Sequence, residues 1–347
     1  MELGLNVGYW GMGNDARNID LAVEADRLGF HVAWVAEAYG SDAVSVMAYL
    51  ASRTTRMDIG SAVMQIPART PTMTAMTAAT LDSLSGGRFR LGLGVSGPQV
   101  SEGWHGVRFG SPLGRTREYV DIVRLAWSRK RVRYDGKYFQ LPLPDGPGKA
   151  LVLTVHPVRK QIPIYLASLG PKNLELTGEI ADGWLGVMSA YDDMGQVVDR
   201  IKAGRAIAAK SMDEFDVAIS CGVAIGDDLE EAANLIRPGQ ALYIGGMGSR
   251  EKNFYNQNAT RLGYGERAAE IQDLYLARKY DEAAAAVPLE FVDRTSLIGP
   301  VDRVAERLRA LQEAGIDTVN ASIATKGDAA MDQLRSLAKA AKKAGIL

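Results

Sequence analysis

Short apolar stretches alternate along the chain with longer segments that repeat apolar residues at helical spacing. The short stretches predict strands at 3–9, 32–36, 57–64, 88–95, 162–167, 183–187, 215–224 and 318–323. The longer segments predict helices at roughly 16–28, 43–54, 71–84, 113–128, 171–181, 194–210, 228–236, 300–314 and 328–344. Eight such βα units in 347 residues predict an α/β fold, a closed (β/α)8 TIM barrel rather than an open sheet.

Two stretches break this alternation. Residues 130–160 contain RVRYDGKYFQLP, which predicts a hairpin around Asp135 and Gly136. Residues 237–296 hold two adjacent glycines followed by polar and alanine-rich helical sequence. Both are interpreted as insertions in βα loops, which in a barrel lie at the active-site face or its rim. No second domain or short repeat is recognisable, so residues 1–347 are expected to form one barrel domain.

The predicted strand at 88–95 is unusual because Gly92 and Gly94 interrupt its apolar alternation. Glycine inside a strand often marks the close approach of another backbone or of a ligand. The strand runs into Ser96 and Gly97 at its carboxyl end, where α/β proteins bind their ligands. Arg88 opens the same strand at the opposite face, so a structural role is expected for it.

Composition excludes several classes of partner. The 40 basic and 41 acidic residues leave a net charge of -1, which argues against nucleic acid or an anionic membrane as partner. No apolar run approaches the length of a membrane span, and the N-terminal residues do not resemble a signal peptide. The single cysteine, Cys221, cannot form an internal disulfide, so a cytoplasmic location is expected.

Common catalytic motifs are missing. No glycine-rich phosphate motif opens a helix, no cluster has metal-ligand spacing, and only three histidines occur, so no metal is expected. The remaining option is a ligand held by backbone and small side chains at the tips of the predicted strands. The first strand ends in Asn6, Tyr9 and Trp10, and the second ends in Glu37, Ala38 and Tyr39.

The turn after the fifth predicted strand suggests an anion site. Gly170 allows a sharp turn, and Pro171 suits the first position of a helix. The amides of Lys172 and Asn173 would then face the open end of the barrel at the positive end of the helix dipole, which suits a phosphate. An ordinary βα turn would have the same sequence, and this alternative stays open.

Four stretches resemble the bacterial luciferase-like flavin and deazaflavin oxidoreductases: AVEADRLGFHVAWVAE, RMDIGSAVMQIPARTPTMTAMTAATLDSLSGGRFRLGLG, IPIYLASLGPKNLELTGEIADGW and LIGPVDRVAERLRALQEAGIDTV. The resemblance covers essentially the whole chain and is strongest to the branch that uses coenzyme F420, which includes methylenetetrahydromethanopterin reductase and F420-dependent glucose-6-phosphate dehydrogenase. It implies a TIM barrel, coenzyme F420 as cofactor, hydride transfer to or from a small-molecule substrate, and a homodimer. An FMN-dependent monooxygenase is the alternative, and a non-catalytic cofactor-binding protein is a second alternative.

The resemblance also implies which residues hold the cofactor. The Ala62–Val63 bond matches a non-prolyl cis peptide that forms a bulge behind the deazaflavin ring, and Gln65 would approach the polar edge of the ring. Residues flanking the ring would be Gly94, Val95, Ser96 and Gly97. Residues holding the phosphate of the cofactor tail would be Ser168, Gly170, Pro171, Lys172 and Asn173.

The proton donor is less clear. Related enzymes often carry a histidine where this chain has Ala38, and the reductase carries a glutamate where this chain has Asn6. Glu37 is a candidate acid or a ligand of the cofactor's heterocycle, although it could equally cap the following loop. His105 is the one histidine on the predicted active-site face, and it could equally be a packed loop residue. Trp10, Tyr39 and Trp184 could wall an apolar substrate pocket or simply pack.

Overall fold

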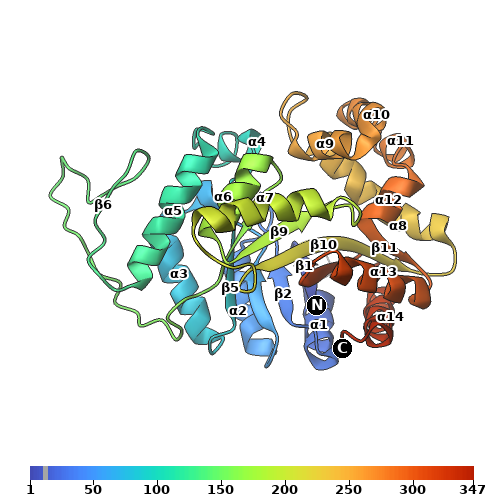
Figure 1. The fold of residues 1–347 in the computed structure, drawn as a ribbon, viewed down its shortest axis with the longest axis horizontal. Helices are drawn as coiled ribbons and strands as arrows, with labels where there is room; N and C mark the ends of the chain where they lie inside the picture. Colours follow the sequence, from blue (N-terminus) through green and yellow to red (C-terminus); the bar gives the residue numbers. More distant parts are fainter. Residues whose placement is uncertain (11–14) are drawn as a thin grey trace.

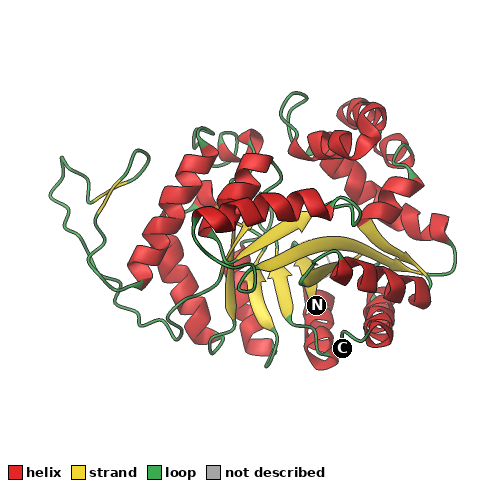
Figure 2. Ribbon diagram, in the orientation of Figure 1, coloured by secondary structure: helices red, strands yellow, loops and turns green. Residues whose placement is uncertain are grey.

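The computed structural model describes residues 1–10 and 15–347. Eight parallel strands form a ring, with β12 paired to both β10 and β1, and with β9 paired to β10. They are β1 (Glu2–Gly8), β2 (Val32–Val35), β3 (Asp58–Ser61), β5 (Phe89–Gly94), β8 (Ile164–Ala167), β9 (Gly183–Val187), β10 (Asp216–Ile225) and β12 (Thr318–Ile323). Figures 1 and 2 show these strands at the centre of the molecule, with helices outside them. The predicted (β/α)8 barrel is confirmed, and all eight of its strands had been predicted.

The helices of the outer layer also follow the sequence pattern closely. They are α1 (Asp15–Leu28), α2 (Ala43–Arg53), α3 (Pro71–Leu84), α5 (Pro112–Trp127), α6 (Pro171–Ile180), α7 (Met194–Ile207), α8 (Leu229–Ala241), α13 (Val301–Glu313) and α14 (Asp328–Ala344). Local chemistry fixes their starts: Thr70 accepts a hydrogen bond from the Met73 amide at the start of α3, and Pro71 occupies its first position. No helix in the described part of the chain is long and apolar enough to cross a membrane.

Strand residues alternate between two packed layers. Leu3, Leu5 and their counterparts on the other strands pack outward against the helices in one large apolar cluster. The inner layer contains Val32, Trp34, Tyr165, Leu185 and Ala218.

The amino-terminal end of the barrel is closed by Arg90. Its guanidinium, which is 8% exposed, binds Asp58 at 2.7 Å, Asp216 at 3.1 Å and the Tyr165 hydroxyl at 2.9 Å. Nearby, Arg88 donates hydrogen bonds to carbonyl groups at the ends of α2 and α3, which confirms its structural role.

The segment at 237–296 is an insertion between β10 and α13. After α8 it contains two single turns of π-helix, η2 (Leu242–Gly246) and η3 (Thr260–Tyr264), and the helices α9 (Phe254–Ala259), α10 (Gly265–Leu276), α11 (Tyr280–Ala285) and α12 (Leu289–Thr295). These elements share an apolar cluster separate from that of the barrel, and they gather at one end of the strands (Figure 1). The insertion ends in a short strand, β11 (Ser296–Gly299), that pairs with the far half of β10 and that the sequence pattern did not predict.

The segment at 130–160 does form the predicted hairpin, from β6 (Tyr134–Asp135) and β7 (Gln140–Leu141). It does not lie in a βα loop, because it follows α5 and precedes β8. Its end contacts α3 and the start of β5, where the Arg159 guanidinium binds the Asp82 carboxylate and the Phe89 carbonyl oxygen. The hairpin itself turns back along α5, and the Glu118 carboxylate accepts hydrogen bonds from three of its amides.

Candidate functional site

The third barrel strand is interrupted at its carboxyl end. Pairing with β5 runs to Gly60 opposite Arg90 and resumes at Met64 opposite Leu93, in the two-residue strand β4 (Met64–Gln65). Residues 61–63 therefore face one residue fewer on β5 and form a bulge, within which the Ala62–Val63 peptide bond is cis. These are the residues at which the family resemblance places the support of the cofactor ring.

Side-chain hydrogen bonds replace the missing strand pairing at this bulge. The Ser61 hydroxyl donates to the Gly92 carbonyl oxygen at 2.8 Å and accepts from the Gly92 amide at 3.0 Å. Because Ser61 is fully buried, both backbone groups of Gly92 are satisfied without water. The bulge is thus a bonded part of the barrel wall.

The two glycines of β5 make room for this bulge. A Cβ atom on Gly92 would lie 1.8 Å from the Ser61 carbonyl oxygen, and one on Gly94 would lie 2.5 Å from Val63 Cγ2. Both distances are far inside van der Waals contact. The close approach predicted at these glycines is therefore that of the neighbouring strand and its Val63 side chain, and no ligand is needed to explain it.

Predicted site residues from three loops meet beside the bulge. The Gln65 side chain is 2% exposed, donates to the Ala38 carbonyl oxygen at 2.8 Å and accepts from the Ser96 hydroxyl at 2.6 Å. Ser96 has a φ of 59°, a left-handed conformation that few non-glycine residues adopt. The two hydrogen bonds of the Gln65 side chain link the ends of β2, β4 and β5, and the Gln65 amide also donates to Glu37. Glu37, Gln65 and Ser96 therefore belong to one hydrogen-bonded group.

Glu37 is held in this group by Arg69, a residue that the sequence analysis did not identify. The Arg69 guanidinium forms two hydrogen bonds with the carboxylate, at 2.6 and 2.8 Å. The amides of Ala43 and Gln65 also donate to its oxygens. The paired carboxylate raises the pKa of Arg69. These four donors occupy both carboxylate oxygens, so the geometry favours a role for Glu37 in positioning the loops.

Loss of the two hydrogen bonds between Arg69 and Glu37 should lower the free energy of unfolding. We expect Arg69→Lys to lower the free energy of unfolding by about 1–2 kcal/mol, because an ammonium keeps the charge but cannot bind both oxygens. Urea unfolding followed by circular dichroism measures the change. Arg267→Lys, in an exposed pair with Glu270, is the control and should change stability by less than about 0.5 kcal/mol. Equal effects at the two positions would contradict the role assigned to Arg69.

The predicted anion site lies at the start of α6. Gly170 precedes the helix in an extended conformation, and its carbonyl oxygen accepts from the Asn173 and Leu174 amides. The Lys172 amide makes no hydrogen bond to any described residue. Ser168 is buried, with its hydroxyl bonded to Thr177 and its carbonyl oxygen accepting from Trp184 Nε1 at 2.8 Å. Ser168 and Trp184 therefore support the turn from behind, and Trp184 does not wall a substrate pocket.

The Arg261 guanidinium, which the sequence analysis also did not identify, lies close to this turn. Arg261, from η3 in the insertion, donates to the Leu169 carbonyl oxygen at 3.1 Å and to Asn258 Oδ1 at 2.8 Å. Its side chain is exposed, so its remaining donors are free to reach an anion at the start of α6. No pattern near Arg261 could have shown this, because 92 residues separate it from Leu169.

The structure does not link His105 to the group around Gln65. His105 follows the short helix α4 (Pro98–Ser101), and its amide donates to the Val100 carbonyl oxygen. Its Nε2 atom is buried with no partner among the described residues. Val95, another of the predicted site residues, lines a pocket of about 260 Å³ together with Arg69 and with Phe139 of the hairpin. His105 does not line this pocket. A catalytic role for His105 stays a prediction.

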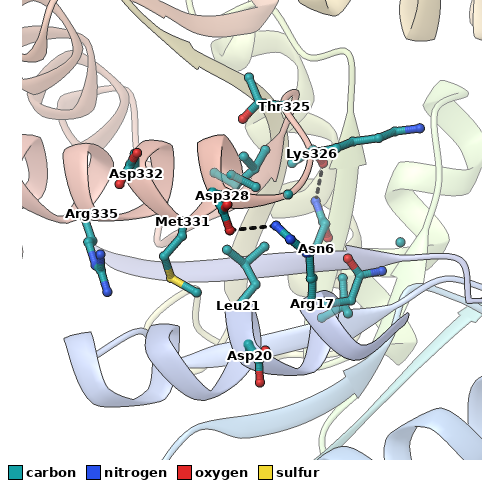
Figure 3. Close-up of a pocket in the computed structure, with 17 residues that line it drawn as sticks. Asn6, Arg17, Asp20, Leu21, Thr325, Lys326, Asp328, Met331, Asp332 and Arg335 are labelled. Carbon is teal, nitrogen blue, oxygen red and sulfur yellow. Dashed lines mark hydrogen bonds and ion pairs between the residues drawn. The ribbon is translucent and has the colours of Figure 1, made fainter. Parts of the chain in front are cut away.

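A second cavity is lined by residues of β1, α1, β12 and α14 (Figure 3). It has a volume of about 670 Å³ and opens where the ends of β1 and β12 meet the starts of α1 and α14. Asn6 lies on its wall and donates to the Ser322 hydroxyl at 2.9 Å, and Arg17 pairs with Asp328 across it. None of the predicted cofactor residues lines this cavity, so it is separate from the predicted cofactor site.

The fold and these contacts define a (β/α)8-barrel protein whose candidate site residues lie at the carboxyl ends of the strands. The family model described as luciferase-like monooxygenase matches residues 9–318. A Mycobacterium tuberculosis protein that carries the provisional name coenzyme F420-dependent oxidoreductase is 43% identical over 97% of this chain and 98% of its own. The 5,10-methylenetetrahydromethanopterin reductase of Archaeoglobus fulgidus is 31% identical over 85% of this chain and 86% of its own.

The structural comparison agrees. The coenzyme F420-dependent tetrahydromethanopterin reductase from Methanopyrus kandleri superposes with a TM-score of 0.82 at 25% identity, over 97% of this chain and 96% of its own. The chain therefore belongs to the luciferase-like monooxygenase family, and the resemblance stated from its sequence is confirmed.

Proposed function

We propose that this protein is a coenzyme F420-dependent oxidoreductase that transfers a hydride between the deazaflavin and a small organic molecule. The observation that carries the proposal is that the bulge at 61–63 and the predicted anion site at the start of α6 both lie at the carboxyl ends of the strands. Relatives named for coenzyme F420, at 43% and 25% identity, support it. The finer predictions of a homodimer in the cytoplasm belong to the same proposal.

The residues present fit such a cofactor. The unpaired Lys172 amide, the helix dipole of α6 and the Arg261 guanidinium suit the phosphate of its tail. Val63, packed on Gly94, would support one face of a flat ring, and Gln65 would orient its polar edge. When bound, a deazaflavin supplies hydride chemistry, because carbon replaces the N5 nitrogen of a flavin and one-electron and oxygen chemistry become poor. The protein's own contribution is then orientation and the exclusion of water.

Two titrations test this proposal. We expect purified protein to bind oxidised coenzyme F420 with micromolar affinity, followed by the fluorescence of the cofactor, and to bind FMN more weakly. Tight binding of FMN together with no binding of the deazaflavin would overturn the proposal in favour of the monooxygenase alternative.

The second alternative, a non-catalytic binding protein, draws support from one observation. Both oxygens of the Glu37 carboxylate accept hydrogen bonds from Arg69 and two amides, so the carboxylate is already engaged within the protein. Oxidation of the reduced cofactor that depends on an added substrate decides between the two. We expect such oxidation with at least one of four substrate classes: enones, imines, alcohols and sugar phosphates. No oxidation with any of the four classes would favour the binding protein.

A further inference from the structure

The π-turn η3 brings Arg261 to the turn before α6, yet little within η3 itself holds it there. None of its five residues is buried, and Gly263 departs from helical geometry with a φ of 95°. The Arg261 side chain is bonded through one nitrogen, Nη2, which donates to the Leu169 carbonyl oxygen and to Asn258 Oδ1. An exposed arginine has much rotamer freedom to lose. The position of Arg261 therefore depends on what fixes the backbone of η3.

Arg294, near the end of α12, fixes this backbone. Its Nη1 atom donates to the Leu262 carbonyl oxygen at 3.2 Å and to the Tyr264 hydroxyl at 3.1 Å. Leu262 follows Arg261 directly in the chain. The Tyr264 ring also packs nearly perpendicular to the buried Phe291 ring of α12, with the ring centres 5.0 Å apart. The turn η3 is thus attached to α12 by hydrogen bonds and by an aromatic contact.

Arg294 is itself anchored to a loop of the barrel. Its Nε atom donates to Asp192 Oδ2 at 3.0 Å, and its Nη2 atom donates to Asp192 Oδ1 at 2.9 Å, which makes a two-point ion pair. Asp192 lies between β9 and α7, and the amide of its neighbour Tyr191 donates to the Arg294 carbonyl oxygen at 3.3 Å. All three guanidinium nitrogens of Arg294 are therefore bonded within the protein, and they join this loop to the backbone beside Arg261.

We propose that Arg294 is a positioning residue that holds Arg261 at the start of α6, so that the phosphate of the cofactor meets a guanidinium already in place. This inference rests on the proposed function. Because the Arg294 guanidinium is bonded to Asp192, Leu262 and Tyr264, its effect on the phosphate passes through η3. Holding a side chain in its bound arrangement lowers the entropy lost when the ligand binds. Lysine could not replace Arg294, because an ammonium lacks the planar fork that binds a carboxylate at two points.

The test compares two ligands on the full-length protein by fluorescence titration: oxidised coenzyme F420 and the same deazaflavin without its phosphate tail. We expect Arg294→Lys to weaken the binding of coenzyme F420 about fivefold to tenfold, and to change the binding of the phosphate-free deazaflavin less than about twofold. Tyr264→Phe removes one hydrogen bond and keeps the ring on Phe291, so it should weaken coenzyme F420 about twofold to threefold. A general loosening of the insertion would instead weaken both ligands equally.

A double-mutant cycle shows whether Arg294 acts through Arg261. We expect Arg261→Gln alone to weaken coenzyme F420 about tenfold, because it removes the charge that faces the phosphate. In the Arg261→Gln protein, Arg294→Lys should then have little further effect, since the group that Arg294 positions is gone.

Arg303→Lys is the matched control. Arg303 forms a similar two-point pair with Asp293, at 3.1 and 2.9 Å, but in the described part of the chain it bonds to no residue of η3. The control should leave the affinity for both ligands unchanged.

Any of four results would overturn the inference: unchanged affinity of Arg294→Lys for coenzyme F420, equal weakening of both ligands, no effect of Arg261→Gln, or an equal loss of affinity in Arg303→Lys. Effects of Arg261→Gln and Arg294→Lys that simply add would overturn it as well. Circular dichroism checks that each variant is folded, and Tyr264→Phe decides with the same two ligands if Arg294→Lys does not fold. Failure of the unmodified protein to bind coenzyme F420 would instead count against the proposed function, so the two failures are distinguishable.

Discussion

Replacing Gly92 with alanine is expected to lower the free energy of unfolding by about 2–4 kcal/mol. The new methyl group would lie 1.8 Å from the Ser61 carbonyl oxygen, a backbone atom that cannot move without breaking the bulge at 61–63. The two bonds between the Ser61 hydroxyl and Gly92 would be lost with it. Chemical unfolding followed by far-ultraviolet circular dichroism measures the effect.

Gly239→Ala is the matched control for this prediction. Gly239 lies within α8, and a Cβ atom there would meet nothing within 4 Å. The substitution should therefore be neutral or stabilise the protein by up to about 1 kcal/mol, because alanine suits a helix better than glycine. A stability of Gly92→Ala equal to that of the unmodified protein would show that β5 and the bulge are not packed as described.

Gly170→Asp is expected to weaken the binding of coenzyme F420 by about 10–100-fold, equivalent to about 1.4–2.8 kcal/mol. The new carboxylate would sit at the start of α6, where the phosphate of the cofactor is expected, and would repel it. The fold should persist, because nothing lies within 4 Å of a Cβ atom at Gly170 and its φ of -82° suits any residue. Fluorescence titration with the cofactor measures the affinity.

Gly170→Asn separates charge from size in this experiment. Asparagine has the shape of aspartate and can likewise cap the helix, but it brings no negative charge. We expect it to retain most of the affinity for the cofactor. If the two variants bind equally well, or equally poorly, the start of α6 is not the phosphate site, and the free donors of Arg261 serve another purpose.

The parts of this molecule that follow a local pattern could be predicted from the sequence. The eight barrel strands and the bounds of α3 and α14 follow from apolar periodicity and from capping residues such as Thr70. The hairpin at Asp135 and Gly136 follows from turn chemistry. Gly92 marked a close approach correctly, although the partner proved to be the backbone of Ser61.

The parts that depend on contacts distant in sequence could not be predicted. The pairing of Glu37 with Arg69 joins residues 32 positions apart, so no local pattern could show it. The position of the hairpin along α5 depends on Glu118, whose sequence context gives no such signal. The strand β11 is too short to stand out, since four apolar or small residues fit a helix end equally well.

The contacts of Arg90 at the amino-terminal end of the barrel have a consequence for how the protein can evolve. Trp34, Tyr165 and Leu185 fill the interior next to Arg90, so the barrel is a packed core. The loops at the carboxyl ends of the strands lie outside this core. Substitutions in those loops are therefore expected to change ligand binding without disturbing the contacts of Arg90 that hold the strands together.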